Sequence, residues 1–217
     1  MINEFQTIID NLVRWGESCN NLRAAVIIGS QARQNRHADR YSDLDIILVA
    51  DEADYFLSSD DWLKNIGSFY VSFVENAIYG AKERRILFDG ALDVDFLILP
   101  YNIINSIGRE AAVILGRGYR ILIDKIGLSN ILTPLVSTKK PYRPLTEYDF
   151  INLVNDFWYH SVWTAKKLKR GELWTAKFCV DSYMKRKLLS IIEHHAHVTH
   201  GLEHDTWHSG RFIEEWA

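Results

Sequence analysis

The sequence has few cysteines, few prolines and no long apolar run, and each shortage narrows the possibilities. Two cysteines among 217 residues, Cys19 and Cys179, do not make a disulfide framework, and we interpret both as buried or incidental thiols. No stretch approaches the roughly 20 apolar residues that a membrane helix needs. The N-terminus lacks the basic and apolar regions of a signal peptide. These absences predict a soluble, cytoplasmic protein that does not enter a membrane.

The chain also lacks an excess of charge of one sign. Its formal net charge is −3, which argues against general binding of nucleic acid, because such binding favours a basic surface. Apolar residues make up 47 % of the chain, which is ample for a packed core. The composition therefore predicts a folded globular protein and leaves its oligomeric state open.

Hydrophobic periodicity divides the chain into two parts. In the first part we expect helices at 3–17 and from about 60 and 103, and strands at 24–29, 45–50, 69–74, 84–88, 94–99 and 120–125. Three of the four prolines fall between Thr133 and Pro144, which predicts a linker. Beyond it, residues 150–169 and 175–197 have helical periodicity, and Thr146 and Asp149 have the spacing of a capping box. We predict an α+β fold, with a mixed sheet flanked by helices in residues 1–135 and a helical domain in residues 145–217.

Two aspartates, Asp43 and Asp45, stand one residue apart at the head of an apolar strand. Residues i and i+2 of a strand point to the same face, so the two carboxylates aim together and repel. Asp93 and Asp95 repeat the pattern at the start of a later strand. If the two strands pair, Asp43, Asp45 and Asp95 converge. Three carboxylates can hold two Mg²⁺ ions, the arrangement used in phosphoryl and nucleotidyl transfer.

A Gly29-Ser30 turn ends the strand that precedes these aspartates. Glycine lets a phosphate approach the backbone closely, and the serine hydroxyl and nearby amides can donate to its oxygens. An Asp-x-Asp pair by itself is more often a turn or an exposed strand end. The turn, the pair and the distant third aspartate together predict a site for a metal and a triphosphate.

Several motifs carry a resemblance to known proteins. GSQARQNRHADRYSDLDIILV with a third aspartate on a later strand resembles the polymerase-beta-like nucleotidyltransferase superfamily. FDGALDVDFLILP, YRILIDKIG and NDFWYHSVWTAKKLKRGELWTAKF, in this order, make nearly the whole chain similar to the aminoglycoside 6-adenylyltransferases, or streptomycin adenylyltransferases. The resemblance implies a nucleotidyltransferase fold for residues 1–135. It also implies Mg²⁺-dependent transfer of AMP from ATP to a hydroxyl of a cationic aminoglycoside, with release of pyrophosphate and resistance to the antibiotic.

The resemblance also implies roles for particular residues. The metal ligands would be Asp43, Asp45 and Asp95, and the triphosphate would be held by Gly29 and Ser30. Asp156 would be a general base or a partner for the amino or guanidino groups of the drug, with a solvent-facing helix acid as the open alternative. Lys177 would neutralise the triphosphate, unless it is an ordinary exposed lysine. The helical domain would close the cleft.

Two departures from the family pattern leave other functions open. Gln31 stands where the family often has arginine after Gly-Ser, and family members usually continue beyond Trp216-Ala217. One alternative is the same chemistry on another acceptor, either a protein hydroxyl or a small molecule. The other is a non-catalytic nucleotide-binding paralogue, which the intact aspartates disfavour because unpaired clustered acids are costly.

Six of the eight histidines fall within residues 194–208. His200, His204 and His208 would align on a continuous helix, and such an array can bind Zn²⁺. Gly201 makes a continuous helix doubtful, so ordinary surface histidines are the favoured interpretation.

Overall fold

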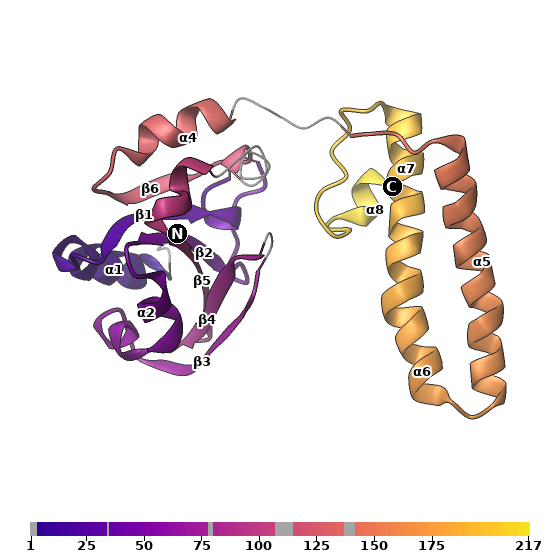
Figure 1. The fold of residues 1–217 in the computed structure, drawn as a ribbon, viewed down its shortest axis with the longest axis horizontal. Coiled ribbons are helices and arrows are strands. Elements are labelled where there is room, and N and C mark those ends of the chain that lie inside the picture. The colour runs from indigo at the N-terminus through magenta and orange to yellow at the C-terminus, as the bar shows by residue number, and fades with distance from the viewer. Residues whose placement is uncertain (1–3, 34, 78–79, 107–114, 137–141) are drawn as a thin grey trace. The chain divides into compact units, whose positions relative to one another are not determined.

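The computed structural model describes residues 4–33, 35–77, 80–106, 115–136 and 142–217. The chain divides into two compact units, residues 1–139 and 140–217. The first unit contains a sheet with helices and the second is helical (Figure 1). This arrangement confirms the predicted α+β class. Among the described residues, no helix combines the length and the apolar character needed to span a membrane.

A mixed sheet of six strands organises the described part of the first unit. Its strand order is β3-β4-β5-β2-β1-β6. At the centre, β2 (Leu44–Ala50) and β5 (Leu92–Pro100) pair in parallel, whereas the other neighbouring strands are antiparallel. The remaining strands are β1 (Leu22–Ile28), β3 (Phe69–Asn76), β4 (Lys82–Phe88) and β6 (Arg120–Asp124). The parallel register sets Asp45 directly opposite Asp95.

One face of the sheet is covered by the main apolar core. Helix α1 (Gln6–Ser18) places its apolar side chains at helical spacing, and Leu12 is fully buried there. Helix α2 (Ala53–Ser58) and the 3₁₀ turn Asp61–Asn65 add Phe56 and Trp62, whose rings meet edge to face. Burial of apolar surface on this face is the main stabilising contribution to the unit.

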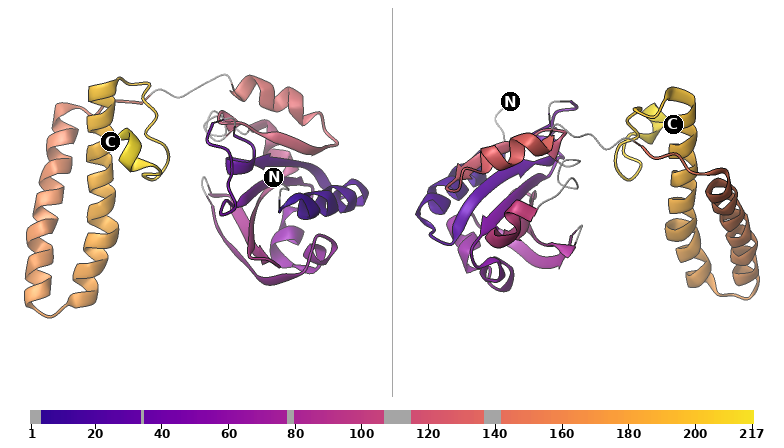
Figure 2. Two further views of the ribbon diagram at one scale, coloured as in Figure 1. Left: turned by 180° about the vertical axis from the view of Figure 1, so that it is seen from behind. Right: turned by 45° about the horizontal axis from the view of Figure 1, so that its top comes forward.

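Among the described residues, the opposite face of the sheet is covered over β6, β1 and part of β2. Helix α4 (Leu128–Val136) lies over this face (Figure 2). Together with the 3₁₀ segment Tyr101–Ser106 it contributes to a smaller apolar cluster that includes Val26, Ile104 and Leu128. On the same face, β4 carries the charged side chains of Glu83 and Arg85, and β5 carries Asp95. This charged half of the face positions the candidate site.

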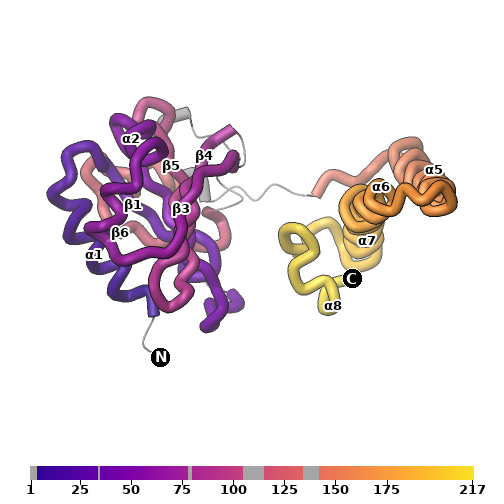
Figure 3. The backbone as a smooth tube through the Cα atoms, turned by 90° about the horizontal axis from the view of Figure 1, so that it is seen from below, coloured from indigo at the N-terminus to yellow at the C-terminus, as the bar shows by residue number. Residues whose placement is uncertain are grey.

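The second unit is built on long helices. Helix α5 (Glu147–Lys169) runs beside α6 (Leu173–Phe178), a π-helical turn (Cys179–Met184) and α7 (Lys185–His200), and α8 (Ile213–Trp216) follows (Figure 3). Thr146 caps α5, because its Oγ1 accepts a hydrogen bond of 3.1 Å from the backbone N–H of Asp149. The predicted cap is therefore confirmed.

Some predicted elements differ from the structure. The helix expected from about residue 60 is the 3₁₀ turn Asp61–Asn65, and α2 before it was not predicted. Residues 133–136, where the linker was expected to begin, belong to helix α4, and residues 137–141 lie outside the described part. The long helix expected at 175–197 is interrupted by the π turn. Short elements carry too few residues for periodicity to reveal them.

Candidate metal and nucleotide site

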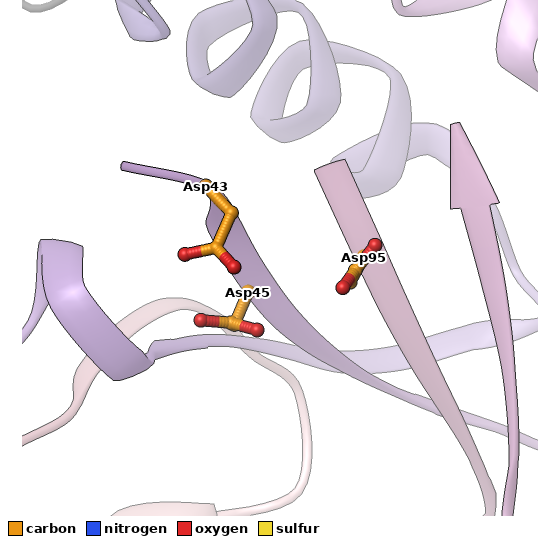
Figure 4. A group of neighbouring side chains, drawn as sticks. All are labelled: Asp43, Asp45 and Asp95. Atoms are coloured by element: carbon orange, nitrogen blue, oxygen red, sulfur yellow. The ribbon is translucent and has the colours of Figure 1, made fainter. Parts of the chain in front are cut away.

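Three carboxylates converge where β2 and β5 pair. Asp45 and Asp95 are opposite each other, and Asp43 lies just before β2 on the same side (Figure 4). One carboxylate oxygen from each residue lies within 4.8 Å of the other two. Over the described ranges, this is the one group of three or more His, Cys, Asp or Glu side chains that could hold a metal ion.

The third carboxylate, Asp95, is buried and incompletely satisfied. Its side chain is 7 % exposed, and Arg85 on β4 donates from Nη2 to its Oδ2 at 2.8 Å. Its Oδ1 has no hydrogen-bond partner among the described residues. Burial raises the pKa of the Asp95 carboxyl to about 7; Arg85 opposes this shift, whereas Asp93, Glu83 and Asp43 add to it.

The donor set fits a hard divalent cation. Mg²⁺ prefers oxygen ligands and is commonly held by carboxylates together with substrate phosphates. A buried carboxylate oxygen without a partner is costly unless a donor or cation satisfies it. The three aspartates, and the unsatisfied Oδ1 of Asp95 in particular, are therefore suited to hold Mg²⁺.

The Gly29-Ser30 turn packs directly against the first two aspartates. Gly29 has φ +66°, and a Cβ at this position would lie 2.0 Å from Oδ2 of Asp45. Glycine is required here both by the left-handed backbone and by the close approach of a carboxylate. Ser30 is buried, and its hydroxyl donates to the backbone oxygen of Asp43 at 3.1 Å. The turn therefore packs closely against Asp43 and Asp45. Its contact with phosphate stays a prediction.

A hollow of about 470 Å³ opens beside the aspartates. Two of the three aspartates, two other polar residues and four apolar residues line it: Ile28, Asp45, Ile46, Asn76, Ala77, Glu83, Asp95 and Leu97. All of these residues belong to the first unit. Its volume is in the range of small-molecule sites.

Three residues near this site were not singled out from the sequence. Arg85 and Glu83 lie on β4, and their i, i+2 spacing could have indicated that they share one face. Gly118 has φ +128°, and a Cβ there would lie 2.4 Å from the backbone oxygen of Ala32. It thus lets a second loop approach the segment that follows Ser30.

Asp156 lies in the second unit and is surrounded by donors. The hydroxyl of Tyr183 lies 3.0 and 2.8 Å from its two carboxylate oxygens. Nδ1 of His160 lies 2.7 Å from Oδ1, and Nζ of Lys187 lies 2.8 Å from Oδ2. The hydrogen bond from Lys187 is the largest cause of a lowered pKa at Asp156. Lys177, also in this unit, is exposed and paired with Asp181.

The histidines of residues 194–208 do not form the array considered from the sequence. Helix α7 ends at His200, and Gly201 follows with φ +101°. His204 lies beyond this break, with Nε2 3.1 Å from the backbone oxygen of Trp216. A continuous helix that aligns His200, His204 and His208 is therefore not formed.

Comparisons with known proteins identify the family of the chain. The family described as streptomycin adenylyltransferase matches residues 2–217. An aminoglycoside 6-adenylyltransferase of Campylobacter jejuni is 21 % identical over 218 residues, which cover 97 % of this chain and 73 % of the relative. An aminoglycoside 6-adenylyltransferase of Staphylococcus aureus is 22 % identical over 207 residues, or 91 % of this chain and 71 % of the relative.

The solved structures that resemble this chain include a crystal structure of an aminoglycoside 6-adenyltransferase from Bacillus subtilis. It aligns with 100 % of this chain and 76 % of its own length, at 16 % identity and a TM-score of 0.42.

The sequence matches define an enzyme of the nucleotidyltransferase class, and the mixed sheet with its aspartate cluster agrees with this. Within that class, the chain belongs to the streptomycin adenylyltransferase family, whose match extends over nearly its whole length. The resemblance that the motifs indicated is thereby confirmed.

Proposed function

We propose that this protein transfers AMP from ATP to a hydroxyl of an aminoglycoside such as streptomycin, releases pyrophosphate and so confers resistance. Residues 1–135 are the proposed nucleotidyltransferase domain, and residues 145–217 are the proposed helical domain. The observation that carries the proposal is the convergence of three carboxylates within 4.8 Å in a chain of this family. Such a cluster suits nucleotidyl transfer better than any purely structural role, because it is electrostatically costly without a cation.

Asp43, Asp45 and Asp95 would hold the Mg²⁺ ions, two in the arrangement that we favour. When bound, the ions neutralise charge on the triphosphate and polarise the phosphorus that is attacked. Ser30 donates a hydrogen bond to the backbone of Asp43, and Gly29 leaves room for the carboxylate of Asp45. Both residues would present backbone amides to the phosphates.

Asp156 and Lys177 have less direct support. As a general base, Asp156 would work best with a pKa near the operating pH, whereas Lys187, Tyr183 and His160 hold the pKa of its carboxyl low. We therefore favour Asp156 as a residue that organises its surroundings or pairs with the amino groups of the drug. Lys177 remains proposed as a partner of the triphosphate.

Mass spectrometry tests the proposed reaction directly. The protein is incubated with ATP, Mg²⁺ and streptomycin, and the antibiotic is examined for an added AMP group. We expect the adduct with the wild-type protein and its loss with Asp43→Asn. Absence of an adduct across a panel of aminoglycosides would overturn the proposal.

A different acceptor is the second candidate, because identities of 21 and 22 % to the named relatives leave room for a changed acceptor. Labelled AMP that passes to a component of a cell extract, but not to streptomycin, would select it. Tight binding of ATP and Mg²⁺ without turnover on any acceptor would instead indicate a non-catalytic paralogue.

A further inference from the structure

We propose that Glu83 binds a cationic group of the acceptor in the hollow beside the aspartates. This inference rests on the proposed function, since it concerns the acceptor of that reaction. It assigns recognition of an ammonium or guanidinium group to a carboxylate that lies outside the three proposed metal ligands.

Glu83 belongs to a line of charges across three strands. On the open face of the sheet, Glu75 of β3 is opposite Glu83, and Arg85 of β4 is opposite Asp95 of β5. Two like charges directly opposite each other destabilise a sheet. The cation that offsets them is Arg85, whose Nε lies 2.9 Å from Oε1 of Glu75 and 3.1 Å from Oε1 of Glu83.

The single guanidinium of Arg85 is shared too widely to neutralise this face. It contacts Glu75, Glu83 and Asp95 at once. Divalent ions on the three aspartates would leave the two glutamates with only Arg85 between them. A bound triphosphate adds further negative charge next to them. A cationic acceptor would therefore be attracted to this face.

The hollow adjoins the proposed metal site, so a ligand in it would lie next to the bound cations. Asp95 lines it, is 5 % exposed, and has an Oδ1 without a hydrogen-bond partner in the described residues. A site that keeps a buried acceptor atom unsatisfied is built for a donor or a cation that comes from outside the chain.

The other lining residues suit a hydrophilic ring compound that carries cations. Glu83 faces the hollow from β4, and Asn76 at the end of β3 adds an amide that can donate and accept. Leu97 and Ile28 supply apolar surface for the carbon skeleton of the acceptor. A charge-assisted hydrogen bond from an ammonium or guanidinium to Glu83 would fix its orientation.

Calorimetric titration with streptomycin tests the assignment without depending on turnover. The full chain is saturated with Mg²⁺ and a non-hydrolysable ATP analogue, and Glu83→Gln is compared with Asp51→Asn. Asp51 is a matched control, because it is ion-paired with Arg23 in the same unit but does not line the hollow. We expect Glu83→Gln to weaken binding about tenfold or more and Asp51→Asn to leave it unchanged.

Further measurements separate recognition from folding and from metal binding. Glu83→Asp keeps the charge and should recover part of the lost affinity. Mn²⁺ affinity should stay the same in Glu83→Gln, because the three aspartates are intact. In turnover, KM for streptomycin should rise while KM for ATP and kcat change little.

The outcomes distinguish this inference from the proposed function. If the wild type adenylylates streptomycin and Glu83→Gln binds it equally well, the inference is wrong and the function stands. If streptomycin binding depends on Glu83 but no AMP is transferred, the proposed function is wrong, and Glu83 is a residue that binds a cationic ligand and not an acceptor. A wild type that does not bind streptomycin at all overturns the inference.

Discussion

Asp95 in the first unit and Asp156 in the second are both carboxylates beside a basic residue, yet their surroundings differ. Asp156 receives a hydroxyl, a ring nitrogen and an ammonium, and its pKa is lowered. Asp95 has Arg85 on one oxygen and no partner for the other within the described structure, and its pKa is raised to about 7. A fully paired carboxylate stabilises its own unit, whereas an under-satisfied one beside two further acids is prepared for a cation.

The largest expected effect separates the two carboxylates by activity. Asp43→Asn removes one member of the aspartate cluster, so the rate of pyrophosphate release with ATP and streptomycin should fall on the order of 10³-fold or more, equivalent to about 4 kcal/mol. Steady-state assays measure this loss. If Asp43→Asn keeps its activity within about tenfold of wild type, the cluster does not carry the chemistry.

Because the pKa of Asp95 is raised, its protonated form stabilises the folded protein at low pH and its ionised form destabilises it at high pH. The ordinary pKa of an unfolded Asp is about 3.9, so the folded state binds this proton more tightly. The resulting stabilisation is complete below about pH 4 and is lost as the pH rises through about 7. At pH 8 without metal, the free energy of unfolding of Asp95→Asn should therefore exceed that of wild type by about 2–4 kcal/mol. Thermal unfolding should show this difference as a higher unfolding temperature.

Mg²⁺ provides the control for this prediction. It should raise the unfolding temperature of the wild type at pH 8 and have little effect on Asp95→Asn. At pH 4 the two proteins should be nearly equal in stability. A wild type that is the more stable of the two at pH 8 without metal would contradict the account of Asp95.

Gly29→Ala tests whether the close packing of Gly29 against Asp45 is needed for metal binding. The new Cβ would lie 2.0 Å from Oδ2 of Asp45 in a left-handed backbone. We expect a loss of about 1–3 kcal/mol in unfolding free energy together with weaker metal binding. Gly80→Ala is a matched control, because Gly80 also has positive φ but a Cβ there meets nothing within 4 Å. Equal effects on metal binding would show that backbone strain alone is responsible.

The smallest effect is expected in the second unit. Tyr183→Phe removes one donor from Asp156 and should lower the unfolding free energy by about 1 kcal/mol, as for a typical hydrogen bond. The loss should be smaller in an Asp156→Asn background, because the two residues share one network. Thermal unfolding of the four proteins measures this coupling. A kcat that falls more than about 100-fold in Asp156→Asn, with stability unchanged, would favour the general-base role instead.

Much of the first unit could be predicted because its central strands are short apolar runs bounded by turn residues. The same-face placement of Asp43 and Asp45 follows from strand geometry. The pairing of β2 with β5, which brings in Asp95, depends on a connection through other strands, and local sequence does not specify it. The roles of Arg85 and Glu83 could not be predicted from the sequence for the same reason, because their partners are set by the register of β4 against its neighbours.

The second unit was predictable as helical but not in its side-chain network. Tyr183 lies in the π turn, which changes the angular spacing between α6 and α7, so regular helical periodicity misplaces the residues after it. Lys187 reaches Asp156 across two helices from 31 positions away in the chain, a separation that no local pattern encodes. Hence the sequence indicated Asp156 as a candidate but not its state of pairing.

Titration with Mn²⁺, followed by electron paramagnetic resonance, tests the central claim most directly. Wild type should bind Mn²⁺ in competition with Mg²⁺, and Asp95→Asn should bind it at least about tenfold more weakly, whereas Asp156→Asn should bind it as the wild type does. Failure of the wild type to bind Mn²⁺, or equal binding by wild type and Asp95→Asn, would contradict the assignment of the three aspartates to a divalent cation.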